Sequence, residues 1–249
     1  MNQNRRRFIQ KIAVASVLGP ALHAPLVWGR GSTPVKAIIF DAFPVFDPRP
    51  IFGLVKKLFP QRGAQFSVLW RTRIFEYTWL LASAGKYQDF WACIDDALVF
   101  TAKQLNITLS PENHARLMNA FLDISAYSDV KPILKKFKAD GIKLAFLSNM
   151  TEKMLAAAIK NSGLDGYFDH VLSTDQAKTF KPHPRAYQLG LDYSAFASWD
   201  AIGAKWFGYP TVWINRLQFN PETIGLLPDR TGKDLSVLRD FVIPEPEIQ

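Results

Sequence analysis

A carboxylate at the end of an apolar run is the first feature of this sequence that could do chemistry. Asp41 directly follows residues 37–40, which have the composition of a buried strand. A carboxylate held in an enclosed cleft at such a position can act as a nucleophile. Lys181 is a candidate counter-charge that would keep Asp41 ionised, and Asp200 could orient Lys181 or activate water. Taken alone, Asp41 could equally cap a turn or a helix.

The elements that must position these side chains alternate between strands and helices. Two segments that end in glycine, residues 129–141 and 151–163, have apolar residues at helical spacing. The alternation indicates an α/β fold with a Rossmann-like, doubly wound parallel sheet, in which ligands bind at the carboxyl ends of the strands. Asp41, Lys181 and Asp200 are therefore expected to meet at that edge, together with Ser148. The predicted strands are residues 37–40, 142–148, 170–174, 193–198 and 211–214.

Residues 48–127 differ from the rest of the chain because they show no strand pattern. Two long, aromatic-rich stretches within them, residues 66–85 and 90–106, have helical periodicity. We therefore predict an all-helical cap subdomain over residues 48–127. It is inserted into a core domain that consists of residues 31–47 and 128–249.

The first 30 residues have the layout of an export signal rather than of a folded element. Arg5, Arg6 and Arg7 precede an apolar stretch over residues 12–22. This arrangement resembles a twin-arginine signal peptide, and the apolar stretch is too short to span a bilayer permanently. We therefore expect a periplasmic protein without stable membrane insertion. The alternative is a cytoplasmic protein with a basic amino terminus.

The formal net charge of +8 is divided equally between the first 29 residues and the rest of the chain. The first 29 residues contain four basic and no acidic side chains, and the remainder carries 26 basic and 22 acidic ones. No basic stripe with interleaved aromatic residues is present, so we expect no nucleic-acid partner. The single cysteine, Cys93, excludes an internal disulfide and is expected to be a small buried hydrophobic residue.

Taken together, several stretches of this sequence resemble one enzyme superfamily. They are "FDAFPVFD", "LWRTRIFEYTWL", "AFLSNM", "FKPHPRAYQLG", "SWDAIGAKWFGYPTVWINR" and "PDRTGKDLSVLRDF". Over about residues 35–243 the chain resembles the haloacid dehalogenase superfamily, and within it the L-2-haloacid dehalogenases. The resemblance implies a hydrolase of carbon–halide bonds with a helical cap, a small 2-haloacid substrate, no cofactor and a homodimer.

The same resemblance implies a two-step reaction that yields a 2-hydroxy acid. Asp41 would displace the halide and form an ester, and Arg71 on the cap would receive the departing halide. Asp200, with help from Lys181, would activate the water that hydrolyses the ester. The other site residues that the resemblance implies are Ser148 and Asn149, which would hold the substrate carboxylate, the apolar lining Phe43, Phe75, Phe90 and Trp199, and Tyr187 nearby.

Phe43 distinguishes this chain from the phosphatases of the superfamily. Those enzymes place a second aspartate two residues after the nucleophile as an acid for the leaving group, and Phe43 cannot donate a proton. Asp41 and Asp200, next to Lys181, would make a weak magnesium site, so we predict activity without a metal. The alternatives are a phosphatase of the same superfamily and an exported, non-catalytic binding protein on the same scaffold.

The sequence departs from the family pattern at several places near the expected site. Val45 stands where the family has a threonine that bonds to the nucleophile, and His183 replaces a common acid. Ala195 and Ala197 replace residues that help to position water. Residues 182–192 form a shorter crossover than parallel strands usually require, which predicts either a truncated helix or a damaged segment. These departures favour a slower hydrolysis step or a different substrate preference.

Overall fold

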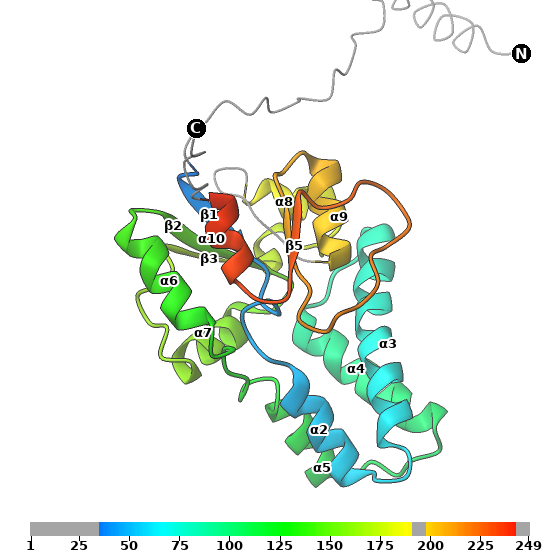
Figure 1. Cartoon of the computed structure of the whole chain (residues 1–249). Helices are drawn as coiled ribbons and strands as arrows, with labels where there is room; N and C mark the ends of the chain where they lie inside the picture. Colours follow the sequence, from blue (N-terminus) through cyan, green and yellow to red (C-terminus); the bar gives the residue numbers. More distant parts are fainter. Residues whose placement is uncertain (1–34, 191–197, 243–249) are drawn as a thin grey trace, which may run out of the picture. The chain divides into compact units, whose positions relative to one another are not determined.

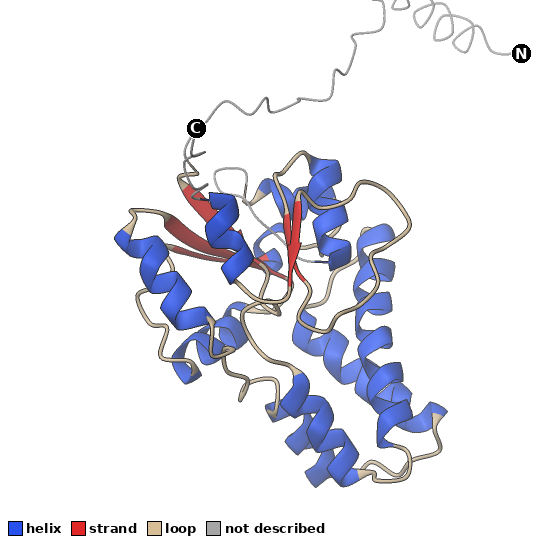
Figure 2. Ribbon diagram, in the orientation of Figure 1, coloured by secondary structure: helices blue, strands red, loops and turns tan. Residues whose placement is uncertain are grey.

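The computed structural model describes residues 35–190 and 198–242, except for the side chains of residues 198 and 199. The described residues belong to one compact unit, Pro34–Gln249. The export signal predicted over residues 1–30 lies outside them. Parallel strands and helices make up the described part, which confirms the predicted α/β class (Figure 2).

Three parallel strands form the sheet that leads to Asp41. β1 (Ala37–Phe40), β2 (Lys143–Ser148) and β3 (His170–Ser173) lie in the order β1-β2-β3. In β1 and β2 every residue after the first is buried, as expected for apolar runs in a sheet covered on both faces. The three corresponding predictions are confirmed to within one residue at each end.

Two further strands, β4 (Val212–Ile214) and β5 (Arg230–Gly232), form a separate parallel pair. β4 confirms the last predicted strand. β5 escapes prediction because Arg-Thr-Gly has no apolar alternation, and two of its three residues are exposed. The strand predicted over residues 193–198 falls mainly outside the described residues. At Ser198 this prediction is wrong, because Ser198 begins the helix α9 (Ser198–Phe207).

The helices beside the three-stranded sheet begin and end where the sequence predicts. α6 (Val130–Ala139) leads into β2, and α7 (Glu152–Asn161) follows it. The hydroxyl of Thr151 accepts a hydrogen bond from the Met154 amide and caps α7. Gly141, with φ of 75°, ends the α6 turn in the left-handed conformation that glycine adopts without strain. The described part ends with α10 (Ser236–Val242).

Four helices form the cap, and Figure 1 shows them grouped together below the strands. Residues 48–127 are all described and contain no strand, so the predicted all-helical character is confirmed. Trp70 Nε1 donates a hydrogen bond to the Ile94 carbonyl at 3.0 Å and thereby links the two longest cap helices. The cap helices are α2 (Arg49–Leu58), α3 (Gly63–Ser83), α4 (Phe90–Gln104) and α5 (Pro111–Asn119).

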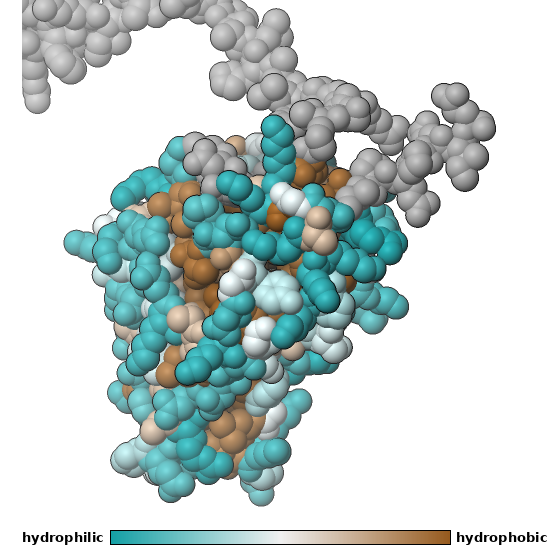
Figure 3. Space-filling view, turned by 90° about the vertical axis from the view of Figure 1, so that its left-hand side faces the viewer, coloured by the Kyte–Doolittle hydropathy of each residue, from teal (hydrophilic) through white to brown (hydrophobic). Residues whose placement is uncertain are grey.

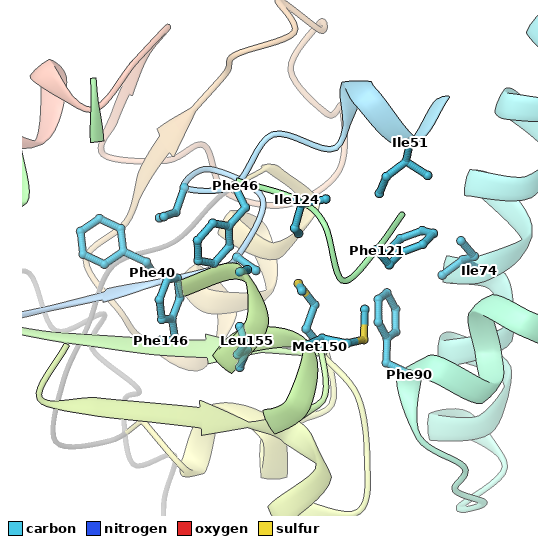
Figure 4. Packing of buried hydrophobic residues seen from close by; sticks show 14 of the residues in the cluster. Phe40, Phe46, Ile51, Ile74, Phe90, Phe121, Ile124, Phe146, Met150 and Leu155 are labelled. Atoms are coloured by element: carbon cyan, nitrogen blue, oxygen red, sulfur yellow. The ribbon is translucent and has the colours of Figure 1, made fainter. Parts of the chain in front are cut away.

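One cluster of buried apolar side chains runs from the sheet into the cap (Figure 4). Phe40 and Phe146, from β1 and β2, lie at one end, and Ile74 and Phe90, from α3 and α4, lie at the other. Burial of this continuous apolar surface holds the cap against the core. Residues of α3 and α4 can therefore line a site at the edge of the sheet. Cys93 is a buried free thiol in the same cluster, as predicted.

The surface is mainly hydrophilic on the side where α6 lies (Figure 3). None of the described helices is long and apolar enough to cross a membrane. Large apolar side chains are nevertheless exposed on α3, on α9 and on the loop that joins β4 to β5. They include Val68, Trp79, Leu80, Trp206, Phe219, Ile224, Leu226 and Leu227.

Candidate active site

A lysine that bridges two carboxylates forms the centre of the candidate site. Lys181 Nζ lies 2.8 Å from Asp41 Oδ1 and 2.5 Å from Asp200 Oδ2. It also donates a hydrogen bond to the Leu147 carbonyl at 3.1 Å. The side chain of Lys181 is 1% exposed, that of Asp200 6% and that of Asp41 15%. The structure thus brings together the three residues that the sequence predicted to meet.

The chain places these three residues through different local elements. Asp41 follows the last residue of β1, as predicted. Lys181 does not follow a strand directly, because the 3₁₀ helix η1 (Thr174–Ala177) separates it from β3. Asp200 lies in the first turn of α9 rather than at the end of a strand. The prediction that all of these residues lie at or just after strand ends is therefore wrong for Lys181, although Lys181 reaches the same edge. For Asp200 the strand predicted before α9 falls mainly outside the described residues.

Ser148 and Asn149, at the end of β2, line a pocket that Asp41, Lys181 and Asp200 also line. Ser148 Oγ accepts a hydrogen bond from the Met150 amide at 3.1 Å. Asn149 Oδ1 accepts hydrogen bonds from the Lys181 amide at 3.0 Å and from the Thr174 hydroxyl at 3.3 Å. These contacts fasten the Lys181 loop to the end of β2. Asn149 therefore fixes the position of the lysine in addition to lining the pocket.

Burial and neighbouring charges shift the pKa values of Lys181 and Asp200. Burial lowers the pKa of Lys181, but the carboxylates of Asp200 and Asp41 raise it by more, so its pKa lies above the usual value. Burial raises the pKa of Asp200 to about 6, although Lys181 and Tyr187 oppose this shift. Lys181 is therefore charged at neutral pH, while Asp200 has a pKa suited to accepting a proton near neutrality.

Tyr187 contacts the site through Asp200. Its hydroxyl donates a hydrogen bond to Asp200 Oδ1 at 2.7 Å, and the Tyr209 hydroxyl donates to the Tyr187 carbonyl at 2.7 Å. Burial and the neighbouring Asp200 raise the pKa of Tyr187, which keeps it a hydrogen-bond donor. A Cβ at Gly203 would lie 2.4 Å from the Tyr187 hydroxyl, so α9 needs glycine there to approach it. Tyr187 does not line the pocket but orients a residue that does.

The pocket above these charges has a volume of about 150 Å³ and a largely apolar wall. Three of its predicted lining residues, Phe43, Phe75 and Phe90, are part of that wall. The side chain of Trp199 lies outside the described residues. The sequence missed the lining residues Met150, Tyr127, Trp213, Arg216 and Phe219. Trp213 and Arg216 could have been found from their place at and just after the end of the last predicted strand.

Arg71 lies beside the pocket rather than in its wall. Its guanidinium lies 5.4 Å from the centre of the Phe219 ring, and Phe219 does line the pocket. No carboxylate of the described residues forms an ion pair with Arg71. The neighbouring Arg73 differs, because it pairs with Glu76 at 2.9 Å and stacks on Phe100 at 4.3 Å. Of the two arginines, only Arg71 lies over a ring that lines the pocket.

The loop after Asp41 is held by contacts that do not involve a hydroxyl at position 45. Val45 is fully buried, and Asp41 Oδ2 accepts a hydrogen bond from the Phe43 amide at 3.2 Å. Arg216 Nε donates to the Pro44 carbonyl at 2.7 Å, and its guanidinium pairs with both oxygens of Asp129. Tyr127 donates its amide to the Val45 carbonyl, and its ring stacks on the Arg216 guanidinium at 3.9 Å. Arg216 of the core and Tyr127 at the end of the cap therefore fix this loop together.

The remaining departures from the family pattern have different outcomes. Residues 182–190, the described part of the crossover after Lys181, contain the short five-residue helix α8 (Pro184–Gln188), in agreement with a truncated helix. His183 Nδ1 accepts a hydrogen bond from the Arg185 amide and caps this helix, so it has a structural role. Ala195 and Ala197 lie outside the described residues.

The site residues offer little to a metal ion. Across residues 35–190 and 198–242, no group of three or more histidine, cysteine, aspartate or glutamate side chains could hold one. The Lys181 ammonium lies between Asp41 and Asp200, where a shared cation would have to bind. A parallel α/β sheet with this Asp–Lys–Asp group at its edge and a helical insertion after its first strand defines the class of capped α/β hydrolases.

Comparisons with known proteins agree with this class. A family model described as haloacid dehalogenase-like hydrolase matches residues 35–193. The (S)-2-haloacid dehalogenase of Pseudomonas sp. (strain YL) is 38% identical over 206 residues, which cover 78% of this chain and 89% of that protein. The chain therefore belongs to the haloacid dehalogenase-like hydrolase family.

Two solved structures extend the similarity to the fold. The crystal structure of one L-2-haloacid dehalogenase has a TM-score of 0.81 and 37% identity, with 84% of this chain and 99% of that chain covered. The L-2-haloacid dehalogenase of Xanthobacter autotrophicus with chloropropionic acid covalently bound has a TM-score of 0.77 and 28% identity. That match covers 85% of this chain and all of the other.

Proposed function

We propose that this protein hydrolyses the carbon–halide bond of short L-2-haloalkanoic acids and releases 2-hydroxy acids. The observation that carries the proposal is the buried Lys181 that bridges Asp41 and Asp200 beneath an apolar pocket. The names of the relatives support the same substrate class. A cavity of about 150 Å³ is the size that holds benzene in an engineered protein core, so the pocket suits a substrate of about six heavy atoms, such as 2-chloropropionate.

In the first step, Asp41 acts as the nucleophile. A carboxylate oxygen attacks C2 of the substrate from the side opposite the halogen, the carbon–halogen bond breaks, and the halide leaves with the bonding electrons. The configuration at C2 inverts, and an ester forms between Asp41 and the substrate carbon. Lys181 forms an ion pair with Asp41 at 2.8 Å and holds the carboxylate in place for the attack, and the largely apolar wall limits the access of water to the nucleophile.

In the second step, water hydrolyses the ester at the aspartyl carbonyl. Asp200 accepts a proton from the attacking water, and its raised pKa of about 6 suits this role. The bond between the aspartyl carbon and the ester oxygen breaks, and that oxygen, which came from Asp41, takes the proton back from Asp200 and leaves as the hydroxyl of the 2-hydroxy acid. The second proton of the water is released to solvent as the Asp41 carboxylate forms again. Lys181 stabilises the negative charge that develops on the carbonyl oxygen.

Two further groups complete the proposed site. Ser148 and Asn149, at the end of β2 and just before α7, are placed to hold the substrate carboxylate through hydroxyl and backbone amide groups. Arg71 supplies the positive charge that receives the halide, because a guanidinium stays charged and loses its hydration relatively easily. Phe43, Phe75 and Phe90 form the apolar surround of the substrate.

Phosphatase activity is disfavoured by Phe43, which lines the pocket two residues after Asp41 and cannot protonate a leaving group. A halide needs no proton to depart. The decisive assay measures halide release from L-2-chloropropionate by the wild type and by Asp41→Asn. A parallel assay measures phosphate release from p-nitrophenyl phosphate in the presence of magnesium. We expect halide release by the wild type alone. Phosphate release without halide release would show a phosphatase. If neither product is released, the protein is a non-catalytic binding protein.

We further propose that residues 1–30 are a twin-arginine signal that sends the protein to the periplasm. The basic start, the apolar stretch over residues 12–22 and the absence of acidic residues support this proposal. The double variant Arg5→Lys, Arg6→Lys should lose periplasmic accumulation in a bacterial host that has this export route. Equal amounts of wild type and variant in the cytoplasm would show that the segment is not a signal.

We also propose a homodimer. The support is the family resemblance and the exposed apolar side chains of α3 and α9, among them Leu80 and Trp206. Light scattering of the purified protein measures its mass directly. A mass near the 28.2 kDa of one chain would contradict the proposal.

A further inference from the structure

The loop that joins β4 to β5 brings an aromatic ring from the core to the cap. Figure 1 shows this loop running beside α3, and the contact between them includes the Phe219 ring and the Arg71 guanidinium at 5.4 Å. Phe219 also lines the pocket that contains Asp41 and Lys181. One aromatic side chain therefore joins the pocket wall to an arginine that does not itself line the pocket.

The loop fixes Phe219 through its backbone. Asn215 Nδ2 donates a hydrogen bond to the Phe219 carbonyl at 2.8 Å, and Asn215 Oδ1 accepts one from the Phe219 amide at 2.9 Å. Gln218, with φ of 54°, adopts the left-handed conformation that closes the turn. Asn215 directly follows β4. The backbone of Phe219 is thus held by the core, while 49% of the residue is exposed.

The guanidinium of Arg71 lies over the face of this ring. A guanidinium over an aromatic face is attracted by the ring quadrupole and keeps its charge, whereas an ion pair with a carboxylate would neutralise that charge. No carboxylate of the described residues pairs with Arg71. Phe219 can therefore restrict the motion of the cation and leave it able to bind an anion.

We propose that Phe219 is a positioning residue that holds Arg71 at the mouth of the pocket to receive the departing halide. This inference rests on the proposed dehalogenase function, because it gives Arg71 the halide as its ligand. Phe219 itself forms no bond with the reacting atoms. Its contribution is the placement of a cation on the cap by a loop of the core, so removal of the ring should weaken halide binding and slow halide departure.

The test compares Phe219→Leu, which removes the ring and keeps an apolar side chain, with Phe219→Tyr, which keeps the ring. Leu226→Ala is the matched control, because Leu226 is 56% exposed on the same loop and does not line the pocket. The readouts are kcat and KM for (S)-2-chloropropionate and the inhibition of the reaction by added bromide. Phe219→Leu should lower kcat and weaken bromide inhibition, each by roughly threefold to tenfold, with little change in KM. Phe219→Tyr and Leu226→Ala should resemble the wild type.

A double-mutant cycle with Arg71→Gln separates positioning of the arginine from a general effect on the pocket. With (S)-2-bromopropionate as substrate, Phe219→Leu should have little further effect once Arg71 is replaced. Bromide inhibition that is unchanged in Phe219→Leu, equal losses in the Leu and Tyr variants, or additive effects in the cycle would each overturn the proposal while leaving the dehalogenase function intact. A wild type that releases no halide would overturn both.

Discussion

Removal of the Tyr187 hydroxyl tests how the structure tunes Asp200. Tyr187 Oη donates a hydrogen bond to Asp200 Oδ1 at 2.7 Å inside the protein, and this bond favours the ionised carboxylate. A hydrogen bond to a charged group is worth about 1.5–3 kcal/mol, and one pKa unit corresponds to about 1.4 kcal/mol. Tyr187→Phe should therefore raise the pKa of Asp200 by about one to two units.

The assay is kcat for (S)-2-chloropropionate as a function of pH in the wild type and in Tyr187→Phe. Asp200 accepts a proton only when it is ionised, so activity should be present above its pKa and should fall as the pH decreases through it. In the wild type, the decrease of kcat on the acidic side of the pH profile should be centred at or below about pH 6, because esterification of Asp41 removes a neighbouring charge that helps to raise the pKa of Asp200. In Tyr187→Phe this acid limb should move upward by about one to two pH units.

The value of kcat at high pH distinguishes a shift in the pKa of Asp200 from a general loss of active-site geometry. If Tyr187 acts through the pKa of Asp200, then kcat at high pH should be close to that of the wild type. An acid limb that stays in place, or one that moves to lower pH, would refute this reasoning. A uniform loss of kcat at every pH would show that Tyr187 supports the geometry of α9 rather than the protonation of Asp200.

The remaining predictions concern the bridge, the loop after Asp41 and the metal. Lys181→Met should abolish halide release and lower the free energy of unfolding by about 3–5 kcal/mol in urea denaturation at neutral pH, because the buried Asp200 and the partly buried Asp41 lose their cation. This deficit should shrink as the pH falls and Asp200 is protonated, so a constant deficit would contradict the cause. Arg216→Met should lower the free energy of unfolding by about 1–2 kcal/mol in the same assay, a modest loss because its ion-pair partner Asp129 is partly exposed. It should also lower kcat, because the Pro44 carbonyl in the loop after Asp41 loses its hydrogen-bond donor. Excess chelator should leave halide release unchanged, whereas a loss reversed by magnesium would show a metal enzyme.

The parts of the fold that depend on local pattern could be predicted from the sequence. The apolar run before Asp41 and the glycines after α6 and α7 act within a few residues, and the structure places β1, β2 and both helices accordingly. β5 could not be predicted, because its three residues pair with β4 through tertiary context and have no strand pattern of their own. At Ser198 the start of α9 overrides the apolar pattern that indicated a strand.

The residues of the candidate site likewise include some that the sequence could identify and others that only the fold brings together. Asp41, Lys181 and Asp200 could be recognised from their residue types and from the family resemblance, but the path that brings them together could not. Lys181 reaches the sheet edge through η1 and a loop that Asn149 fastens, and this contact between Asn149 and the Lys181 amide has no signature in the sequence. Phe219 lines the pocket only because the loop after β4 turns back toward α3, so nothing in its neighbourhood marks it as a site residue.

The path of the transferred oxygen tests the central claim most directly. A single turnover of (S)-2-chloropropionate with excess enzyme in ¹⁸O-labelled water is followed by mass spectrometry of the peptide that contains Asp41 and of the 2-hydroxy acid. If Asp41 is alkylated and water then attacks its carbonyl, the label enters the Asp41 carboxylate and the product carries unlabelled oxygen. Label in the product and none in Asp41 would contradict the account, because it would mean that water attacks the substrate carbon directly.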